Sequence, residues 1–239
     1  MNTNGKTAII AGILFIIATT AGLLSTVFTG SILDAPDYLI KIFANQNQFT
    51  IGVLLKIIAA VTSAGIAIAM YPVMKGSNAG VALGSVVFRA LEACFYIVGV
   101  VSLLSLLTLG QQFATAGAAD RTSLQAIGNL LMSVRKHTAL VGVFAFCLGA
   151  FMYYYLFFQS RLIPRWLSGF GIVAIILMMS ACMLALFSGN LITSYKPLAA
   201  PIGLQEMVLA VWLIVKGFNP SAVASLSAKT ETNELLSAA

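Results

Sequence analysis

The sequence predicts an all-α fold: an integral membrane bundle of six transmembrane helices. Of its 239 residues, 60% are hydrophobic and only 8% are charged, whereas about 25% of the residues in ordinary soluble domains are charged. Several apolar runs also reach the ~20 residues that a helix needs to span a bilayer. In hydrocarbon the backbone must satisfy its own hydrogen bonds, which a helix does within one segment. Lipid is therefore the expected solvent for most of this chain.

Polar turns and prolines divide the chain into six predicted spans. The first follows Lys6 and is longer than the roughly 7 to 15 residues of a secretory signal core, so we expect it to be retained. The second ends near Pro72, and the fifth begins after Pro164, where proline fits the first turn of a helix. The fourth ends in the aromatic run 153–158, which is typical of a membrane interface. The spans are expected at about residues 7–28, 49–74, 80–109, 138–158, 166–187 and 197–215.

Connections and a tail complete the predicted organisation, in which residues 1–218 form a single domain. Residues 31–48 are rich in turn-forming side chains, so we expect a loop there. The longest connection, 110–137, has an apolar face opposite a polar one and predicts a short helix over about 120–134 at the membrane surface. Residues 219–239 are rich in Ser, Ala and Thr, and we expect them to form a disordered cytoplasmic tail.

Basic residues in the predicted loops favour a cytoplasmic N-terminus and a cytoplasmic C-terminus. With this orientation, six Lys or Arg residues lie inside and three to five lie outside, and cytoplasmic loops carry the excess of basic residues in membrane proteins. The inside set is Lys6, Lys75, Arg161, Arg165, Lys216 and Lys229. The outside set is Lys41, Arg121 and Lys196, joined by Arg135 and Lys136 if these lie at the mouth of the fourth span.

Composition excludes several functional classes. The net charge of +6 comes from thirteen scattered basic residues without a basic run, which argues against a nucleic acid partner. The three cysteines share no metal-type spacing, and the single histidine, His137, cannot form a multi-histidine site. We therefore expect no metal and no cofactor. No hydrolase motif and no phosphate-binding glycine loop occurs in the sequence, so the expected partner is the lipid bilayer, and the oligomeric state stays open.

Two charged residues near the middle of the third span are the main clue to function. Arg89 and Glu92 belong to a stripe of polar and small residues whose spacing of four and three places them on one side of a helix. The other members of this stripe are Ser85, Tyr96 and Gly99. A charge at the centre of a membrane helix costs roughly 2.5 to 3.5 kcal/mol on insertion scales, so other groups must offset these two charges.

Two further charged residues are expected at the same depth in the membrane. With a rise of ~1.5 Å per residue, Lys56 of the second span and Glu206 of the sixth lie at about the level of Arg89 and Glu92. Ionisable groups inside a membrane pair with one another or line a wet cavity. Four charges from three helices at one depth therefore indicate a shared environment.

The functional hypothesis is a polar pocket that opens outward under the connection 110–137. Tyr96 is expected on its wall, and Arg135 and His137 are expected at its rim. With these rim residues the pocket is net positive, which suits a small polar or anionic molecule or a lipid head group. Binding or transport of such a ligand is the predicted function.

Two other interpretations of the same charges stay open. In a structural or regulatory membrane subunit, Arg89 and Lys56 pair with Glu92 and Glu206 and fix the register of the helices. In an intramembrane enzyme, Glu92 and Glu206 act as acid and base, joined by His137.

Three stretches of the sequence together resemble a known family. They are FRALEACFYIVG, QSRLIPRWLSGFG and EMVLAVWLIVKGFNPSA, and they begin at residues 88, 159 and 206. These stretches, with the opening KTAIIAGILFIIAT and the loop ILDAPDYL, are similar to the prokaryotic multi-pass family catalogued as domain of unknown function 4386. The resemblance implies a protein of the cytoplasmic (inner) membrane of bacteria or archaea, and it supplies no activity. The family motif carries over onto Arg89, Glu92, Pro164, Trp166 and Glu206.

Overall fold

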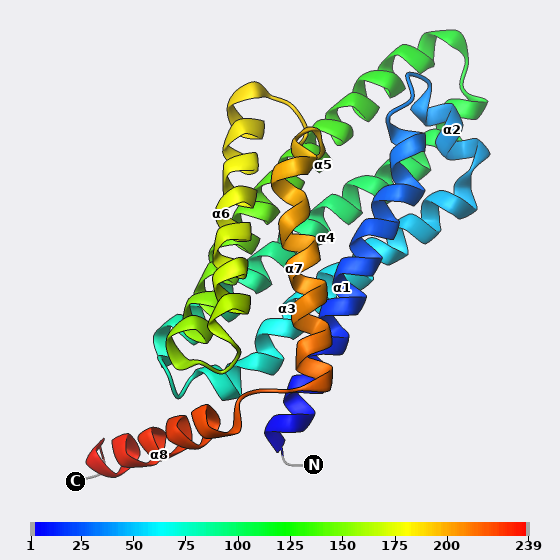
Figure 1. Ribbon diagram of the computed structural model, residues 1–239. Helices are drawn as coiled ribbons and strands as arrows, with labels where there is room; N and C mark the ends of the chain where they lie inside the picture. The colour runs from blue at the N-terminus through cyan, green and yellow to red at the C-terminus, as the bar shows by residue number, and fades with distance from the viewer. Residues whose placement is uncertain (1–2, 238–239) are drawn as a thin grey trace.

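The structure, a computed structural model, describes the backbone of residues 3–237 and the side chains of residues 4–228. Six long helices account for most of the chain, and three short elements connect or follow them (Figure 1). The elements are α1 (Thr3–Leu33), α2 (Tyr38–Ala44), α3 (Gln46–Met74), α4 (Ala79–Thr115), α5 (Ala118–Ser160), α6 (Arg165–Ser188), the 3-10 helix η1 (Ile192–Tyr195), α7 (Lys196–Val215) and α8 (Pro220–Ser237). The predicted all-α class is confirmed.

The six long helices close into a ring. Each packs against two neighbours, in the order α1, α3, α4, α5, α6, α7 and back to α1. Both ends of the described chain lie at the same end of the bundle, where α8 crosses beneath it (Figure 1). We call this the termini end, and the opposite end, which carries α2 and η1, the α2 end.

All six predicted spans correspond to helices of membrane-spanning character. Within the described residues, six helices are long and apolar enough to cross a bilayer: α1, α3, α4, α5, α6 and α7 with η1. Their outward faces carry exposed apolar side chains such as Leu23, Val27 and Phe187, which are 65%, 67% and 86% exposed. Surfaces of this kind are favourable in lipid and costly in water. The chain is therefore a multi-pass membrane protein.

The structure differs from the sequence-based expectations in its connections. The predicted separate helix over 120–134 is wrong, because α5 runs without a break from Ala118 to Ser160, and the long connection shrinks to the two residues between α4 and α5. At ~1.5 Å per residue its 43 residues exceed a ~30 Å hydrocarbon core. The polar residues near its start therefore lie on an extension of a spanning helix.

Two segments expected to lack regular structure are helical. The expected loop 31–48 contains α2, which docks on α4 and is tied to α5 by its first residue, Tyr38. The Tyr38 hydroxyl donates to Asn129 Oδ1 over 3.0 Å, and burial raises the pKa of this phenol. The expected disordered tail is also wrong for residues 220–237, which form α8. Residues 238 and 239 of that tail lie outside the described part of the chain.

Along α3 and α4 the apolar core is split into two clusters, of which the larger also extends along α5, α6 and α7 to η1. On α3, the cluster at the termini end includes Ile66 and Met70, whereas the cluster at the α2 end includes Phe49 and Val53. The buried positions between them on α3 and α4 are polar or small: Ala59, Ala60, Ser63, Ser85, Arg89 and Glu92. We call this intervening level the polar layer.

Glycines on α5 bring α4 close enough to enclose the polar layer. A Cβ on Gly149 would lie 3.0 Å from Cγ of Arg89, and a Cβ on Gly142 would lie 2.8 Å from Cε1 of Tyr96. Gly142 and Gly149 are seven residues apart on α5, and Arg89 and Tyr96 are seven residues apart on α4. The two contacts therefore belong to a single antiparallel alignment of α4 and α5. Any larger side chain at either glycine would push the charged or aromatic partner away from the bundle interior.

A third glycine contact fixes α6 against α5. A Cβ on Gly171 would lie 2.4 Å from Cδ1 of Tyr154. That ring is fully buried, lies 4.5 Å from the ring centroid of Tyr153, and donates a hydrogen bond from its hydroxyl to Gln205 Oε1. The ring is held from three sides and has little freedom to move away.

We expect Gly171→Ala to destabilise the protein, because the added methyl would overpack against the Tyr154 ring at a cost of about 1 to 3 kcal/mol. Thermal unfolding in detergent would show a lowered Tm. Gly203→Ala on α7 is the matched control, since no atom lies within 4 Å of the added Cβ and alanine is the better helix former. An unchanged or raised Tm in Gly171→Ala would contradict the packing described above.

Candidate functional site

A buried ion pair forms the centre of the polar layer. Arg89 Nη1 lies 3.0 Å from Glu92 Oε2, and the two residues are 2% and 3% exposed. Residues three apart on a helix are neighbours on its surface, so α4 alone sets this pairing. The Arg89 Nε donates to the backbone oxygen of Ser63 on α3, over 3.4 Å. The guanidinium also stacks over the ring of Phe146, with Cζ 4.8 Å from the centroid, so three helices surround this cation.

A second carboxylate enters the layer from α7. Thr19 on α1 donates through Oγ1 to Glu206 Oε2 over 2.8 Å, and Glu206 is 9% exposed. Glu206 and Arg89 are near enough for their opposite charges to attract. Opposite charges within a few ångströms are strongly coupled in a medium of low dielectric constant. The α1–α7 side of the ring and the α3–α4 side therefore meet electrostatically at this level.

Lys56 approaches the layer from the α2 end. Its Nζ lies 4.1 Å from the centroid of the Tyr96 ring, a cation–π contact between α3 and α4. Both side chains are half-buried. Lys56 is near enough to Glu92 to be attracted and near enough to Arg135 to be repelled. Lys56 thus connects the buried pair with the half-buried region beside Arg135.

Several buried polar atoms in this region lack a regular hydrogen bond. Among the described side chains they are Ser63 Oγ, Arg89 Nη1, Glu92 Oε2 and Tyr153 OH. The contact between Arg89 Nη1 and Glu92 Oε2 is an ion pair of suitable length that does not have hydrogen-bond geometry. Native proteins leave few buried polar atoms unpaired, because each costs about 1 to 3 kcal/mol. Arg89 Nη1 and Glu92 Oε2 are paired with each other as ions, and the hydroxyls of Ser63 and Tyr153 lie near Glu92 and Tyr154 without a hydrogen bond of regular geometry.

The structure brings together most, but not all, of the sequence-predicted site residues. Arg89, Glu92 and Glu206 are buried in the layer, and Lys56 and Tyr96 stack on each other beside it. Arg135 is half-buried one step further toward the α2 end. His137 is exposed, and its Nδ1 is hydrogen-bonded to Ser133 Oγ of its own helix at 3.3 Å. The structure therefore places His137 apart from the charged group.

The aromatic end of α5 contributes to the interior, which the sequence analysis did not anticipate. Tyr153 and Tyr154 were assigned to an interfacial belt, and this is wrong because both are fully buried. Tyr155 and Phe158 do face outward, at 43% and 40% exposure. Helical periodicity separates the two pairs, but the composition of the run does not reveal which pair points inward.

Other residues of the site also went unrecognised. Gln205 is fully buried, accepts from Tyr154 OH and donates through Nε2 to the backbone oxygen of Leu167 over 3.2 Å. Gln205 stands next to Glu206 in an apolar run, and this position could have indicated from the sequence that Gln205 belongs to the polar interior. Thr19 and Ser63 gave only a weak signal, because hydroxyl residues are common on the small faces of membrane helices.

The layer has no arrangement that resembles a metal site. Among the described residues, no three side chains of His, Cys, Asp or Glu lie close enough together to hold an ion. Its chemistry is that of charge pairing, hydrogen bonding and cation–π contact. Arg89, Glu92 and Glu206 are all buried, so the charged groups of the polar layer are enclosed in this conformation.

Comparison with known proteins gives a family and no function. A search of curated proteins found no match, and a search of solved structures found none either. A family model described as "Domain of unknown function (DUF4386)" matches residues 10–217. This match covers all six long helices apart from the first residues of α1. The chain therefore belongs to the DUF4386 family, and it is a multi-pass membrane protein of that family.

Proposed function

We propose that the polar layer binds a small polar or anionic molecule, or the head group of a lipid, within the membrane. The observation that carries this proposal is a cluster of buried polar atoms without regular hydrogen bonds, namely Ser63 Oγ, Tyr153 OH and the ion-paired Arg89 Nη1 and Glu92 Oε2. A guest with both donor and acceptor atoms would satisfy these four atoms together. Without one, the layer bears several desolvation penalties in hydrocarbon surroundings.

Arginine and lysine side chains in the region can hold an anionic group of that guest. Lys56 and Arg89 lie with Glu92 and Glu206, and Arg135 lies near Asp34, so the cations and carboxylates of the region balance. A guanidinium binds carboxylate and phosphate groups through paired hydrogen bonds. Lys56 adds a point charge on the side from which a ligand would approach.

The two sides of the layer differ in a way that supports access from the α2 end. Toward the termini end, the ring is sealed by fully buried side chains, namely Phe15, Met70, Tyr153, Tyr154 and Phe157. Toward the α2 end, Lys56, Tyr96 and Arg135 are half-buried beside the layer, although Phe49 and Leu106 beyond it are fully buried. Arg89 and Glu92 are themselves enclosed, so a ligand must enter through a movement of helices on that side, as in transporters that alternate between accessible states.

For orientation, we propose that the termini end faces the cytoplasm of a prokaryotic cell. The termini end carries Lys6, Lys75, Arg161, Arg165 and Lys216, against Lys41, Arg121 and Lys196 in the connections of the α2 end, and the side richer in loop Lys and Arg is the cytoplasmic one. Lys229, which the sequence analysis also placed inside, has a side chain outside the described residues. The proposed access route then opens on the outer side.

A structural role is the alternative that a specific observation favours. Arg89 is paired with Glu92, and Glu206 accepts a hydrogen bond from Thr19. Such contacts fix helix register without any ligand. The two roles predict different results when one carboxylate becomes an amide. A binding role predicts loss of the ligand, and a structural role predicts loss of stability alone.

We expect native mass spectrometry of the purified protein to detect a bound small molecule that Glu92→Gln and Glu206→Gln both lose while remaining folded. Each change keeps the side-chain shape but removes a charge and an acceptor oxygen from the layer. Asp120→Asn is the matched control, because it removes an exposed carboxylate at the far end of α5. A wild type without a specific adduct, together with two variants that only melt earlier, would assign these charges to structure alone.

Arg89→Gln should lower the stability of the fold by about 3 to 5 kcal/mol, because it leaves the buried Glu92 charge without its partner. The double variant Arg89→Gln/Glu92→Gln should recover most of that loss, since both charges are then gone. Reversible unfolding in mixed detergent measures both values. Equal destabilisation of the single and double variants would show that the two side chains do not act as a pair.

A further inference from the structure

We propose that a basic groove at the termini end binds the phosphate of an anionic phospholipid head group. Two adjoining hollows, of about 610 and 430 Å³, lie between the α5–α6 turn, the α7–α8 link and the start of α8. Arg161 and Asn219 line both of them. We call the two hollows together the basic groove; its walls also include Arg165, Trp212, Lys216 and Gly217.

Among the side chains that the structure describes, those lining the groove carry positive charge and no carboxylate. Arg161, Arg165 and Lys216 are exposed at its walls, and within residues 4–228 no acidic side chain lines either hollow. Basic pockets between helices on the cytoplasmic side are suited to acidic lipid head groups. Arginine adds the planar donors that match a phosphate.

Backbone contacts hold the groove in shape. The Asn219 N–H donates to the Leu162 oxygen over 2.9 Å, which ties the α7–α8 link to the α5–α6 turn. Leu162 and Phe218 are buried at this junction, at 0% and 6% exposure. Both walls are therefore anchored in the core, and little ordering is needed when a ligand binds.

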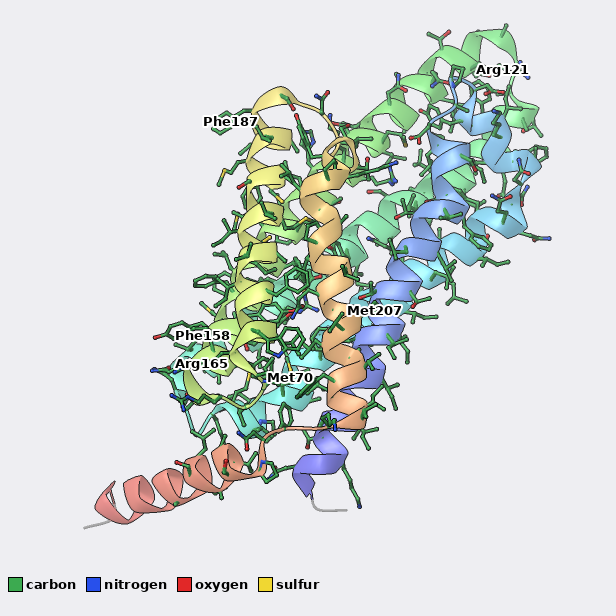
Figure 2. All side chains as sticks on the ribbon, viewed as in Figure 1. Met70, Arg121, Phe158, Arg165, Phe187 and Met207 are labelled. Carbon is green, nitrogen blue, oxygen red and sulfur yellow. The ribbon has the colours of Figure 1, made fainter. Side chains whose placement is uncertain are left out.

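Aromatic side chains place the groove at the level of lipid head groups. Trp166 and Trp212 contact each other edge to face, with centroids 6.3 Å apart, and Trp and Tyr are enriched at membrane–water interfaces. The Arg165 guanidinium stacks on Phe158, with Cζ 5.4 Å from the ring centroid. Figure 2 shows this pair at the bottom of the bundle, near α8. A lipid phosphate at this depth would meet the cations while its acyl chains lie against the apolar helix faces.

The backbone of Arg161 supports a functional role for its side chain. Arg161 has a φ of 58°, and among the described residues it is the one non-glycine with a positive φ. It ends α5 at a position where glycine is the usual residue. Residues held in such a conformation tend to occur at ligand sites, and this side chain lines both hollows.

Native mass spectrometry with added phosphatidylglycerol and phosphatidylcholine of equal chain length tests the proposal. Wild type should bind phosphatidylglycerol about tenfold more tightly, and Arg161→Gln/Arg165→Gln/Lys216→Gln should lose this preference. The control is Lys41→Gln/Arg121→Gln/Lys196→Gln, which removes three cations from the α2 end, where Figure 2 labels Arg121. This control should keep the preference.

A single variant separates binding from folding. Arg161→Gly should weaken phosphatidylglycerol binding severalfold while leaving the Tm unchanged or higher, because glycine adopts a positive φ without strain. The proposal is overturned if the groove triple variant keeps the full preference for phosphatidylglycerol, or if the control triple variant loses as much.

A further arm separates lipid from free phosphate. Inorganic phosphate at millimolar concentration should not displace phosphatidylglycerol from wild type. If phosphate binds in a manner that the groove triple variant abolishes, and no lipid preference is seen, the ligand is a soluble anion and the lipid assignment is overturned. If the only lipid preference is one that Glu92→Gln and Glu206→Gln lose and the groove triple variant keeps, the lipid binds at the polar layer and the groove assignment is overturned.

Discussion

The arrangement of this bundle depends on keeping one guanidinium charged inside a membrane. Burying a lone charged arginine at that depth costs several kcal/mol of free energy. Several neighbours of Arg89 each offset part of that cost. Glu92 neutralises the charge from the same helix, the Ser63 oxygen accepts from Nε, and Phe146 presents its ring face. Gly149 then gives the side chain room beside α5. Helices α3, α4 and α5 are thus placed relative to one another by the needs of one side chain.

The same constraint explains why the apolar core is divided. Charged and hydroxyl side chains cannot interdigitate with Leu and Ile without losing hydrogen bonds, so the polar layer separates the cluster around Met70 from the cluster around Phe49. Close packing within each cluster is stiff, whereas polar contacts can be exchanged for contacts with a guest. A ligand site at this level therefore disturbs less packing than one placed inside either cluster.

Local properties were predictable from the sequence, and properties set by neighbouring helices were not. The six spans follow from apolar runs, and the nearness of Arg89 to Glu92 follows from their spacing on one helix. The inward direction of Tyr154 depends on the approach of α6 at Gly171, and that of Tyr153 on its contact with Phe15 of α1. The sequence did not predict that α5 is continuous, because three polar residues in a row, Arg135, Lys136 and His137, are typical of the end of a membrane span. A helix can nevertheless continue beyond the membrane boundary. Gly142 and Gly149 show their role only when α4 is placed opposite them.

The two proposed sites are mechanically joined by the helices they share. Glu206 and Lys216 are ten residues apart on and just after α7, about 15 Å along its axis, and Tyr153 is similarly related to Arg161 through α5. A helix transmits a displacement of one end to the other because its backbone hydrogen bonds resist bending. A lipid held at the basic groove would fix the ends of α5, α6 and α7 together, so any opening of the layer must occur by movement at the α2 end. Lys56 and Tyr96, which are half-buried, lie on that side of the layer.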